Sequence, residues 1–450
     1  MSGALRQLGL MLYVVDRNST TFETQQEVPK YLNEAIPTFT LLLLLEFVVL
    51  FVAGHGRVRM GDVLTSSGHG LLYDISKLVV HYGELSLYQW LYQYRVLDLD
   101  WRSVGTWWMA ALFIDLAYYW YHRAVHEVNL GWAAHQVHHS SQDYNLSTAL
   151  RQSVFQHFFA LPAYTPLALL GIPLPAIIVH IQLNLLYQFW IHTELVGTLG
   201  PLEWVFNTPS HHRVHHGANK WCLDRNYGGV LIIWDRLFGT FEAERRNQPG
   251  QEIAYGLVGQ PQTYNTLYLQ LFYYQAVFTK AFSMSTWGDL FRALFYGPGW
   301  TPGNPRLGDP TTFPDVKAPR PLYGPEVPLW QQVYATTHYF ICLILQQILV
   351  TNSQVLSWDV MVCHLAFIVV TLGVIGGLYD RRWWWVGLDW IRCITFLAYW
   401  THVVVSVIPW PLLDSLVASL MVASVLLQTS RAITHLWTSL TTHKKIIKRD

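Results

Sequence analysis

Three clusters of histidine stand close together in the middle of the sequence, with a spacing typical of metal binding. They read HRAVH at 122–126, HQVHH at 135–139 and HRVHH at 212–216, with His211 directly before the third. Twelve of the 20 histidines lie between residues 122 and 216, far more than an even scatter would place in a fifth of the chain. Neutral imidazole binds iron, zinc, copper and nickel. The clusters supply the predicted ligands His122, His126, His135, His138, His139, His212, His215 and His216.

The spacing predicts two metal ions rather than one. On a helix, residues three and four apart share a face, so HxxxH directs two imidazoles at one point. HxxHH directs a pair, with a third imidazole close beside it. The clusters supply at least eight nitrogen ligands, whereas a tetrahedral zinc ion takes only four. Burying so many imidazoles without a metal would leave many polar nitrogens unsatisfied.

Four other histidines in this region have to be considered one at a time. His192 ends the apolar run that closes with Gln188-Phe-Trp-Ile-His192 and is a further predicted ligand. Gln188, one turn earlier on the same face, could hold a metal-bound water. His211 is an alternative ligand or a supporting group, because 211 and 215 are also four apart. His157 and His180 face into predicted spans, and we expect them to be structural.

Carboxylates near the clusters are few. A metal-bound histidine commonly donates its other N–H to a carboxylate or a carbonyl. Asp115 precedes His122 by seven residues on the same helical face, and Glu127 directly follows His126. The four candidates for this supporting role are Asp115, Glu127, Asp143 and Glu194, of which Glu127, Asp143 and Asp115 are the candidate catalytic residues. Paired Glu-x-x-His motifs are absent, which argues against a soluble carboxylate-bridged di-iron bundle.

The elements that position these residues are expected to be membrane helices. The chain has 450 residues, of which 52% are hydrophobic and only 13% are charged, against about 25% charged in an ordinary soluble protein. The formal net charge is zero, which gives no argument for nucleic-acid binding. The four cysteines form no CxxC pair, so neither a zinc ribbon nor a disulfide framework is indicated. The N-terminus shows no cleavable signal pattern.

The expected fold is an all-α polytopic membrane protein with about nine transmembrane helices and a histidine-rich di-metal site. A span needs about 20 apolar residues. Several of the runs are short or interrupted by polar groups. They lie at 38–54, 71–93, 105–121, 154–171, 174–191, 330–351, 356–378, 383–407 and 411–429.

Basic residues set the expected orientation, because they concentrate on the cytosolic side. The tail carries Lys444, Lys445, Lys448 and Arg449, so we expect it to be cytosolic. Counting spans backwards from the tail places every histidine cluster on the same cytosolic face. The N-terminus then becomes lumenal, which agrees with the Asn18-Ser-Thr sequon.

Four regions are expected along the chain. Residues 1–104 form an N-terminal region with two spans, and 105–260 form the histidine-rich catalytic domain. Residues 261–329 hold an amphipathic segment near 265–283, on the membrane surface or against the catalytic region, and a Pro/Gly-rich connector. Residues 330–450 form a C-terminal transmembrane bundle with a basic tail.

The order HxxxH, HxxHH and HxxHH at the ends of membrane helices resembles the fatty acid hydroxylase/sterol desaturase superfamily of di-iron membrane oxygenases. Within it, the flanking sequence is similar to the alkylglycerol monooxygenase, or glyceryl-ether monooxygenase, family. The similar segments lie within about 105–260 and are 121–127, 135–153, 207–216, 226–229 and 232–241.

The resemblance implies a specific reaction. Such enzymes cleave the O-alkyl bond of alkylglycerols and lyso-alkylglycerophospholipids, with two iron ions, O2 and tetrahydrobiopterin. Hydroxylation beside the ether oxygen gives a hemiacetal, which collapses to a fatty aldehyde and a glycerol derivative. The nine metal ligands would be the eight cluster histidines and His192, and Glu127 would be needed for activity. An endoplasmic reticulum membrane location and an aldehyde dehydrogenase acting downstream are also implied.

Two other interpretations remain open. One is a sterol, fatty acid, sphingolipid or carotenoid hydroxylase of the same superfamily, fed by a separate haem electron carrier. The sequence contains neither a fused haem domain nor a nucleotide-binding fingerprint, which is consistent with a diffusible reductant. The other is a membrane zinc transporter or metal-binding receptor. Transporters hold their ligands near the middle of the bilayer, whereas these clusters lie at predicted span ends.

Overall fold

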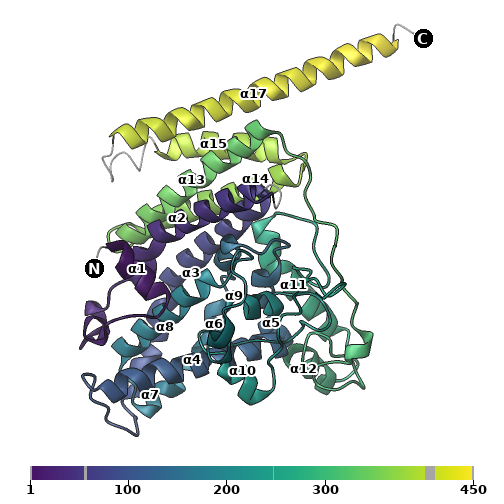
Figure 1. The fold of residues 1–450 in the computed structure, drawn as a ribbon. Helices are drawn as coiled ribbons and strands as arrows, with labels where there is room; N and C mark the ends of the chain where they lie inside the picture. The colour runs from purple at the N-terminus through teal and green to yellow at the C-terminus, as the bar shows by residue number, and fades with distance from the viewer. Residues whose placement is uncertain (1–2, 55–57, 247, 401–410, 448–450) are drawn as a thin grey trace. The chain divides into compact units, whose positions relative to one another are not determined.

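The computed structural model describes residues 3–54, 58–246, 248–400 and 411–447 (Figure 1). Within these ranges the chain is helical and forms no extended strand, only three isolated bridge pairs. It divides into two compact units. The first comprises residues 1–262 and 268–323, and the second comprises 263–267 and 324–450.

The first unit contains the histidine clusters and twelve α-helices among its described residues. Their bounds are α1 Gly3–Met11, α2 Tyr31–Val52, α3 Met60–Tyr92, α4 Val104–Glu127, α5 Asn129–His139, α6 Gln156–Tyr164, α7 Pro166–Leu170, α8 Leu174–Trp190, α9 Pro209–His215, α10 Ile233–Phe238, α11 Thr266–Phe282 and α12 Trp287–Phe295. The first two residues of α11 belong to the second unit. Helix α4 is central, because it packs against α5, α6 and α8.

Buried apolar side chains join α4 to α8 at the end away from the clusters. Ala110 and Ile114 of α4 pack with Leu174 and Ile177 of α8. Tyr88 of α3 contributes its ring to the same core and donates its hydroxyl to the carbonyl of Ile172. This packing fixes the helices whose other ends carry His122 and His192.

Four helical segments of the described chain have the length and apolarity to cross a membrane. They are Gln25–Val52, Leu329–Asn352, Trp358–Tyr379 and Ser415–Thr434. The predicted spans at 71–93, 105–121 and 174–191 fall in α3, α4 and α8, which do not meet the same criteria. The predicted span 154–171 is two short helices, α6 and α7, because Pro166 begins a new helix directly after Thr165.

Part of the topology prediction lies outside the described residues. The predicted span 383–407 begins as α15 at Trp385, but residues 401–410 are not described. The same applies to most of the uncharged loop at 408–411 and to Lys448 and Arg449 of the basic tail.

The second unit is a helical bundle of α13 Leu329–Asn352, α14 Trp358–Tyr379, α15 Trp385–Tyr399 and α17 Pro411–Ile447. An ion pair lies at its centre, where Arg392 donates to the Asp389 carboxylate and both side chains are almost completely buried. Tyr334 of α13 and Gln428 of α17 donate to the other Asp389 oxygen. Arg392 also donates to Thr371 of α14, so this pair connects all four helices.

We expect Arg392→Met to destabilise the second unit, because Asp389 would keep its buried charge without its cation. Breaking a buried pair on one side costs about 3–5 kcal/mol. In the full chain purified in detergent, the apparent Tm should fall by several degrees, and adding Asp389→Asn should restore part of the loss. Lys317→Met, which removes an exposed ion pair with Asp315, is the matched control. An unchanged Tm for Arg392→Met would contradict this assignment.

Candidate metal centre

The first two histidine clusters are brought together by a tight turn between α4 and α5. Helix α4 ends at Glu127, Val128 is extended, and α5 begins at Asn129. Gly131 then lies so close to α4 that an added Cβ would stand 3.0 Å from the Cα of Val125. Because a larger residue would push the helices apart, this glycine allows HxxxH on one helix to face HxxHH on the next.

The nine predicted ligands lie in two adjoining buried groups. In each group, one nitrogen from every member lies within 4.8 Å of those of the others. Group A contains His122, His126, His135, His139 and His215, and group B contains His138, His192, His212 and His216. The groups touch, since the ring centroids of His139 and His216 are 4.4 Å apart.

The helical spacing explains how each cluster contributes to both groups. In HQVHH the i and i+4 pair, His135 and His139, enters group A while His138 enters group B. In HRVHH the i and i+4 pair, His212 and His216, enters group B while His215 enters group A. Each HxxHH motif therefore directs two imidazoles at one point and the third at the neighbouring point.

Backbone carbonyls orient four of the rings. The partners lie 2.7 to 3.1 Å from Nδ1 and are Tyr227 for His122, Arg151 for His138, Gln188 for His192 and Arg225 for His215. A carbonyl can only accept, so each Nδ1 must carry the hydrogen. In the neutral ring the lone pair is then on Nε2, which faces the group.

Two lone pairs in group B, those of His138 and His192, face each other. The Nε2 atoms of His138 and His192 are 3.2 Å apart, although the carbonyl contacts leave a lone pair on both. Two acceptors cannot form a hydrogen bond with each other, whereas a cation between them satisfies both. Two nitrogens that each lie about 2.1 Å from one metal ion are roughly 3.0–3.4 Å apart. The observed separation therefore fits a shared ion.

Group A also has buried nitrogens that lack a hydrogen-bond partner within the described residues, including His126 Nε2 and His215 Nε2. Burial lowers the pKa of His192 to about 4. It lowers the pKa of most of the other rings well below the usual range, namely those of His122, His135, His138, His139, His212, His215 and His216. Neutral, unpaired imidazoles are the form that binds metal, so the donor set fits two ions such as iron.

Asp115 supports the loop that orients His122. Its carboxylate accepts from the backbone N–H of Val230 and Leu231, from Trp234 and from Asn184, all at 2.8–3.0 Å. The loop bound by Asp115 begins just after Tyr227, and the Tyr227 carbonyl accepts a hydrogen bond from His122. Among the described residues, the Asp115 carboxylate thus hydrogen-bonds this loop, Trp234 and Asn184 rather than an imidazole.

The same loop approaches the helices closely at one glycine. A Cβ added to Gly229 would lie 2.8 Å from the Tyr118 ring and 2.9 Å from the Asn184 amide oxygen. Gln188 accepts from the Tyr118 hydroxyl and donates to Asn184, so its side chain is engaged in this network. Its backbone carbonyl is the part that accepts from His192.

Of the other predicted carboxylates, Glu127 and Asp143 have cationic partners. Glu127 accepts from Arg123 at 2.8 Å and pairs with Arg306 of the connector. Asp143 forms an ion pair with Arg59, 2.7 Å away, and Glu194 is exposed. The carboxylate that approaches a ring is Asp224, with Oδ1 3.4 Å from Nδ1 of His126.

Sequence reasoning missed Asp224 and the aromatic walls of the centre. Asp224 has a φ of +58° in the loop after α9, and no periodic pattern marks it. Trp132 lies 5.0 Å from His126 and 5.4 Å from His139 between ring centroids. Tyr227 lies 5.2 Å from His126. The sequence offered two signals for these walls, namely Trp132 three residues before His135 and Tyr227 within the family-like segment 226–229.

The three remaining histidines of the region lie outside both groups. His211 faces Phe241 edge to face, with ring centroids 5.3 Å apart. His157 stacks on Tyr73, and the Nδ1 of His180 lies 2.7 Å from the Tyr13 hydroxyl. The last two positions agree with the structural roles expected for these rings.

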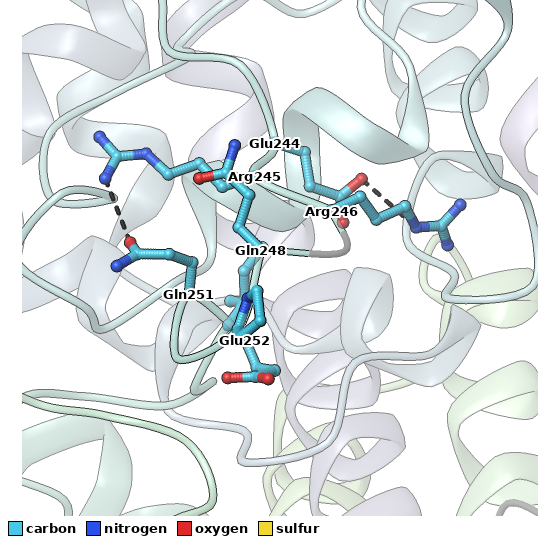
Figure 2. Close-up of a pocket in the computed structure, with 8 residues that line it drawn as sticks. Glu244, Arg245, Arg246, Gln248, Gln251 and Glu252 are labelled. Carbon is cyan, nitrogen blue, oxygen red and sulfur yellow. Dashed lines mark hydrogen bonds and ion pairs between the residues drawn. The ribbon is translucent and has the colours of Figure 1, made fainter.

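A surface hollow of about 370 Å³ lies beside the loop that follows α10. Figure 2 shows its polar lining, in which Arg245 pairs with Gln251 and Arg246 approaches Glu244. Glu244 also forms a bidentate ion pair with the buried Arg213 of α9. The lining contains no histidine of either group, so this hollow is not the metal centre.

The fold and the histidine groups define a helical membrane protein with a clustered-histidine centre. In agreement, residues 107–240 match the fatty acid hydroxylase family, and residues 331–413 match the alkylglycerol monooxygenase C-terminal domain. No solved structure matches the chain.

Curated relatives narrow the class further. The chain is 42% identical to alkylglycerol monooxygenase of Homo sapiens over 390 residues, which cover 86% of each chain. It is 41% identical to alkylglycerol monooxygenase of Danio rerio, again over 86% of each chain. It is 35% identical to that of Caenorhabditis elegans over 88% of this chain and 82% of the relative. The chain therefore belongs to the alkylglycerol monooxygenase family.

We expect His192→Ala to halve the metal content of the purified full chain, because His192 Nε2 lies within 3.2 Å of two other group B nitrogens. Metal content per chain, measured by plasma mass spectrometry, checks this expectation. The matched control is His157→Ala, which removes a ring outside both groups and should keep the wild-type content. Full metal retention in His192→Ala would remove His192 from the ligand set.

We expect Asp115→Asn to weaken metal binding without removing a ligand. The amide would present N–H groups to donors, and the loop that carries the Tyr227 carbonyl would loosen. Loss of such outer support typically costs about 10- to 100-fold in metal affinity. Competition with a chelator measures this loss, with Asp309→Asn in an exposed turn as the control. Equal chelator sensitivity of the two variants would contradict the role given to Asp115.

Proposed function

We propose that this chain is a monooxygenase that cleaves the O-alkyl bond of glyceryl ethers. The observation that carries the proposal is the pair of adjoining all-imidazole groups, which supplies two metal positions in one buried centre. The substrate class follows from relatives named alkylglycerol monooxygenase that match over most of both chains.

Two iron ions held by the nine histidines would supply the oxidising chemistry, with O2 as the oxidant and tetrahydrobiopterin as the two-electron donor. One oxygen atom enters the C–H bond next to the ether oxygen, and the other leaves as water. The resulting hemiacetal breaks its C–O bond to give a fatty aldehyde and a glycerol derivative. An aldehyde-oxidising enzyme is a fitting consumer of the first product.

The protein's own contribution is to orient the rings and exclude water. Tyr227, Arg151, Gln188 and Arg225 present carbonyls that fix the protonated nitrogen of one ring each. Burial keeps those imidazoles neutral, and Trp132 covers group A. Hydrogen-bonded partners of this kind set the orientation and basicity of ligands.

The three predicted catalytic carboxylates take distinct roles in this proposal. Glu127 is the candidate for direct participation, because it follows His126 and its charge is balanced by Arg123 and Arg306. Asp115 and Asp143 are positioning residues, the first through the loop after Tyr227 and the second through Arg59.

We further propose the full topology of about nine spans in the endoplasmic reticulum membrane, with the histidine clusters and the C-terminus cytosolic. Support comes from the basic tail and from the four apolar helices among the described residues. A cytosolic centre would have access to a soluble pterin, and a membrane location gives access to a lipid.

The alternative is a sterol, fatty acid or sphingolipid hydroxylase fed by a haem carrier. We expect membranes containing this chain to release fatty aldehyde from 1-O-alkylglycerol only when tetrahydrobiopterin is added. Turnover of a sterol without pterin would contradict the proposal.

Glu127→Ala should lower kcat by about two orders of magnitude, the usual contribution of a positioned carboxylate, while metal content stays at the wild-type level. The metal measurement separates loss of chemistry from loss of the centre. Glu326→Ala, at an exposed position, is the control. Wild-type kcat in Glu127→Ala would remove Glu127 from the reaction.

A further inference from the structure

Helices α11 and α12 carry five exposed aromatic side chains within 18 residues. We call them the aromatic face, and they are Phe278 (43% exposed), Phe282 (77%), Trp287 (86%), Phe291 (57%) and Phe295 (41%). Phe278 and Phe282 stack on each other, and the rings of Phe291 and Phe295 are 4.5 Å apart. Clustered exposed apolar side chains, unlike single scattered ones, mark an interaction site.

The aromatic face is not the packing face of these helices. Their inner side is already filled by a core of Ala281, Ala293 and Trp300, with Leu290 and Leu294 against it. Trp287, Phe291 and Phe295 follow at intervals of four, which places them on one exposed side of α12. The outward side therefore carries aromatic surface that the protein's own core does not use.

Short hydrogen bonds attach the two helices to the metal centre. Asn129, between the first two histidine clusters, donates its backbone N–H to Tyr296 and its side-chain amide to the carbonyl of Ala293, each at 2.8 Å. Gln136, next to His135, donates to the carbonyl of Leu269 on α11 at 3.0 Å. The aromatic face and the ligand-bearing helices thus belong to one connected assembly.

We propose that the aromatic face lies in a lipid leaflet and holds the metal centre at the surface from which the substrate enters. Segment 266–300 contains only three charged residues, Lys280, Asp289 and Arg292. A helix with Trp and Phe on one side is typical of an interfacial element, whose apolar face enters the boundary between headgroups and acyl chains. Because α2 of the same unit is a candidate span, the bilayer is already next to this unit.

Spin labelling tests the location without any turnover. A nitroxide is placed at Phe291→Cys in the full chain, in a Cys363→Ser background because Cys363 is the exposed one of the four cysteines. The measured quantity is the ratio of the nitroxide's collision rate with O2 to its collision rate with a water-soluble nickel chelate, in phosphatidylcholine nanodiscs. We expect this ratio to be several-fold higher at Phe291→Cys than at Thr312→Cys, which lies in an exposed turn. Equal ratios would place the face in water.

Exclusion of both reagents from Phe291→Cys would mean that protein covers the face, either a second copy or the C-terminal unit, and would also overturn the proposal. Trp287→Glu with Phe291→Glu gives a second test, which rests on the proposed function. The KM for a long-chain alkylglycerol in vesicles should rise about tenfold at unchanged kcat. The KM for a short-chain, water-dispersed substrate and the values for Leu322→Glu should stay unchanged.

An unchanged KM in vesicles would overturn the proposal. If the wild type fails to cleave any glyceryl ether, the proposed function fails, whereas the nitroxide ratio still decides the position of the face.

Discussion

The structure depends on one electrostatic constraint, namely that nine buried imidazoles converge in two adjoining groups and that lone pairs there face each other. At His138 and His192, two unprotonated nitrogens stand 3.2 Å apart because carbonyls hold the hydrogens on the far side of both rings. Neutral acceptors at that distance repel each other, and water is largely excluded from such a buried site. A metal cation removes this cost, so the centre and the surrounding fold are stable together when the ions are bound.

The rest of the first unit serves to keep those rings in place. Gly131 lets α5 approach α4. Asp115 accepts hydrogen bonds from the loop after Tyr227, whose carbonyl accepts from His122. Backbone carbonyls therefore supply most of the orienting acceptors, which spares the buried centre additional negative charge. The helices that carry the rings are also tied to α11 and α12 through Asn129 and Gln136.

The sequence predicted the membership of the family and the set of histidines that lie together, because i and i+4 spacing has a direct meaning on a helix. The allocation of His138 and His215 to opposite groups needs the three-dimensional crossing of three helices. Carbonyl partners carry no side-chain signature, so sequence reasoning looked to carboxylates such as Asp143 and missed Asp224. Hydropathy predicted about nine spans, but among the described helices α3 and α4 carry too many polar residues, and α8, with 17 residues, is too short, to count as candidate spans. The roles of the individual residues in catalysis stay predictions.

Metal analysis of the wild-type full chain, purified without added metal, tests the central claim most directly. The account predicts about two iron ions per chain, which remain bound through gel filtration because four or five imidazoles hold each one. A single labile zinc ion, or a folded metal-free chain with both histidine groups intact, would contradict it.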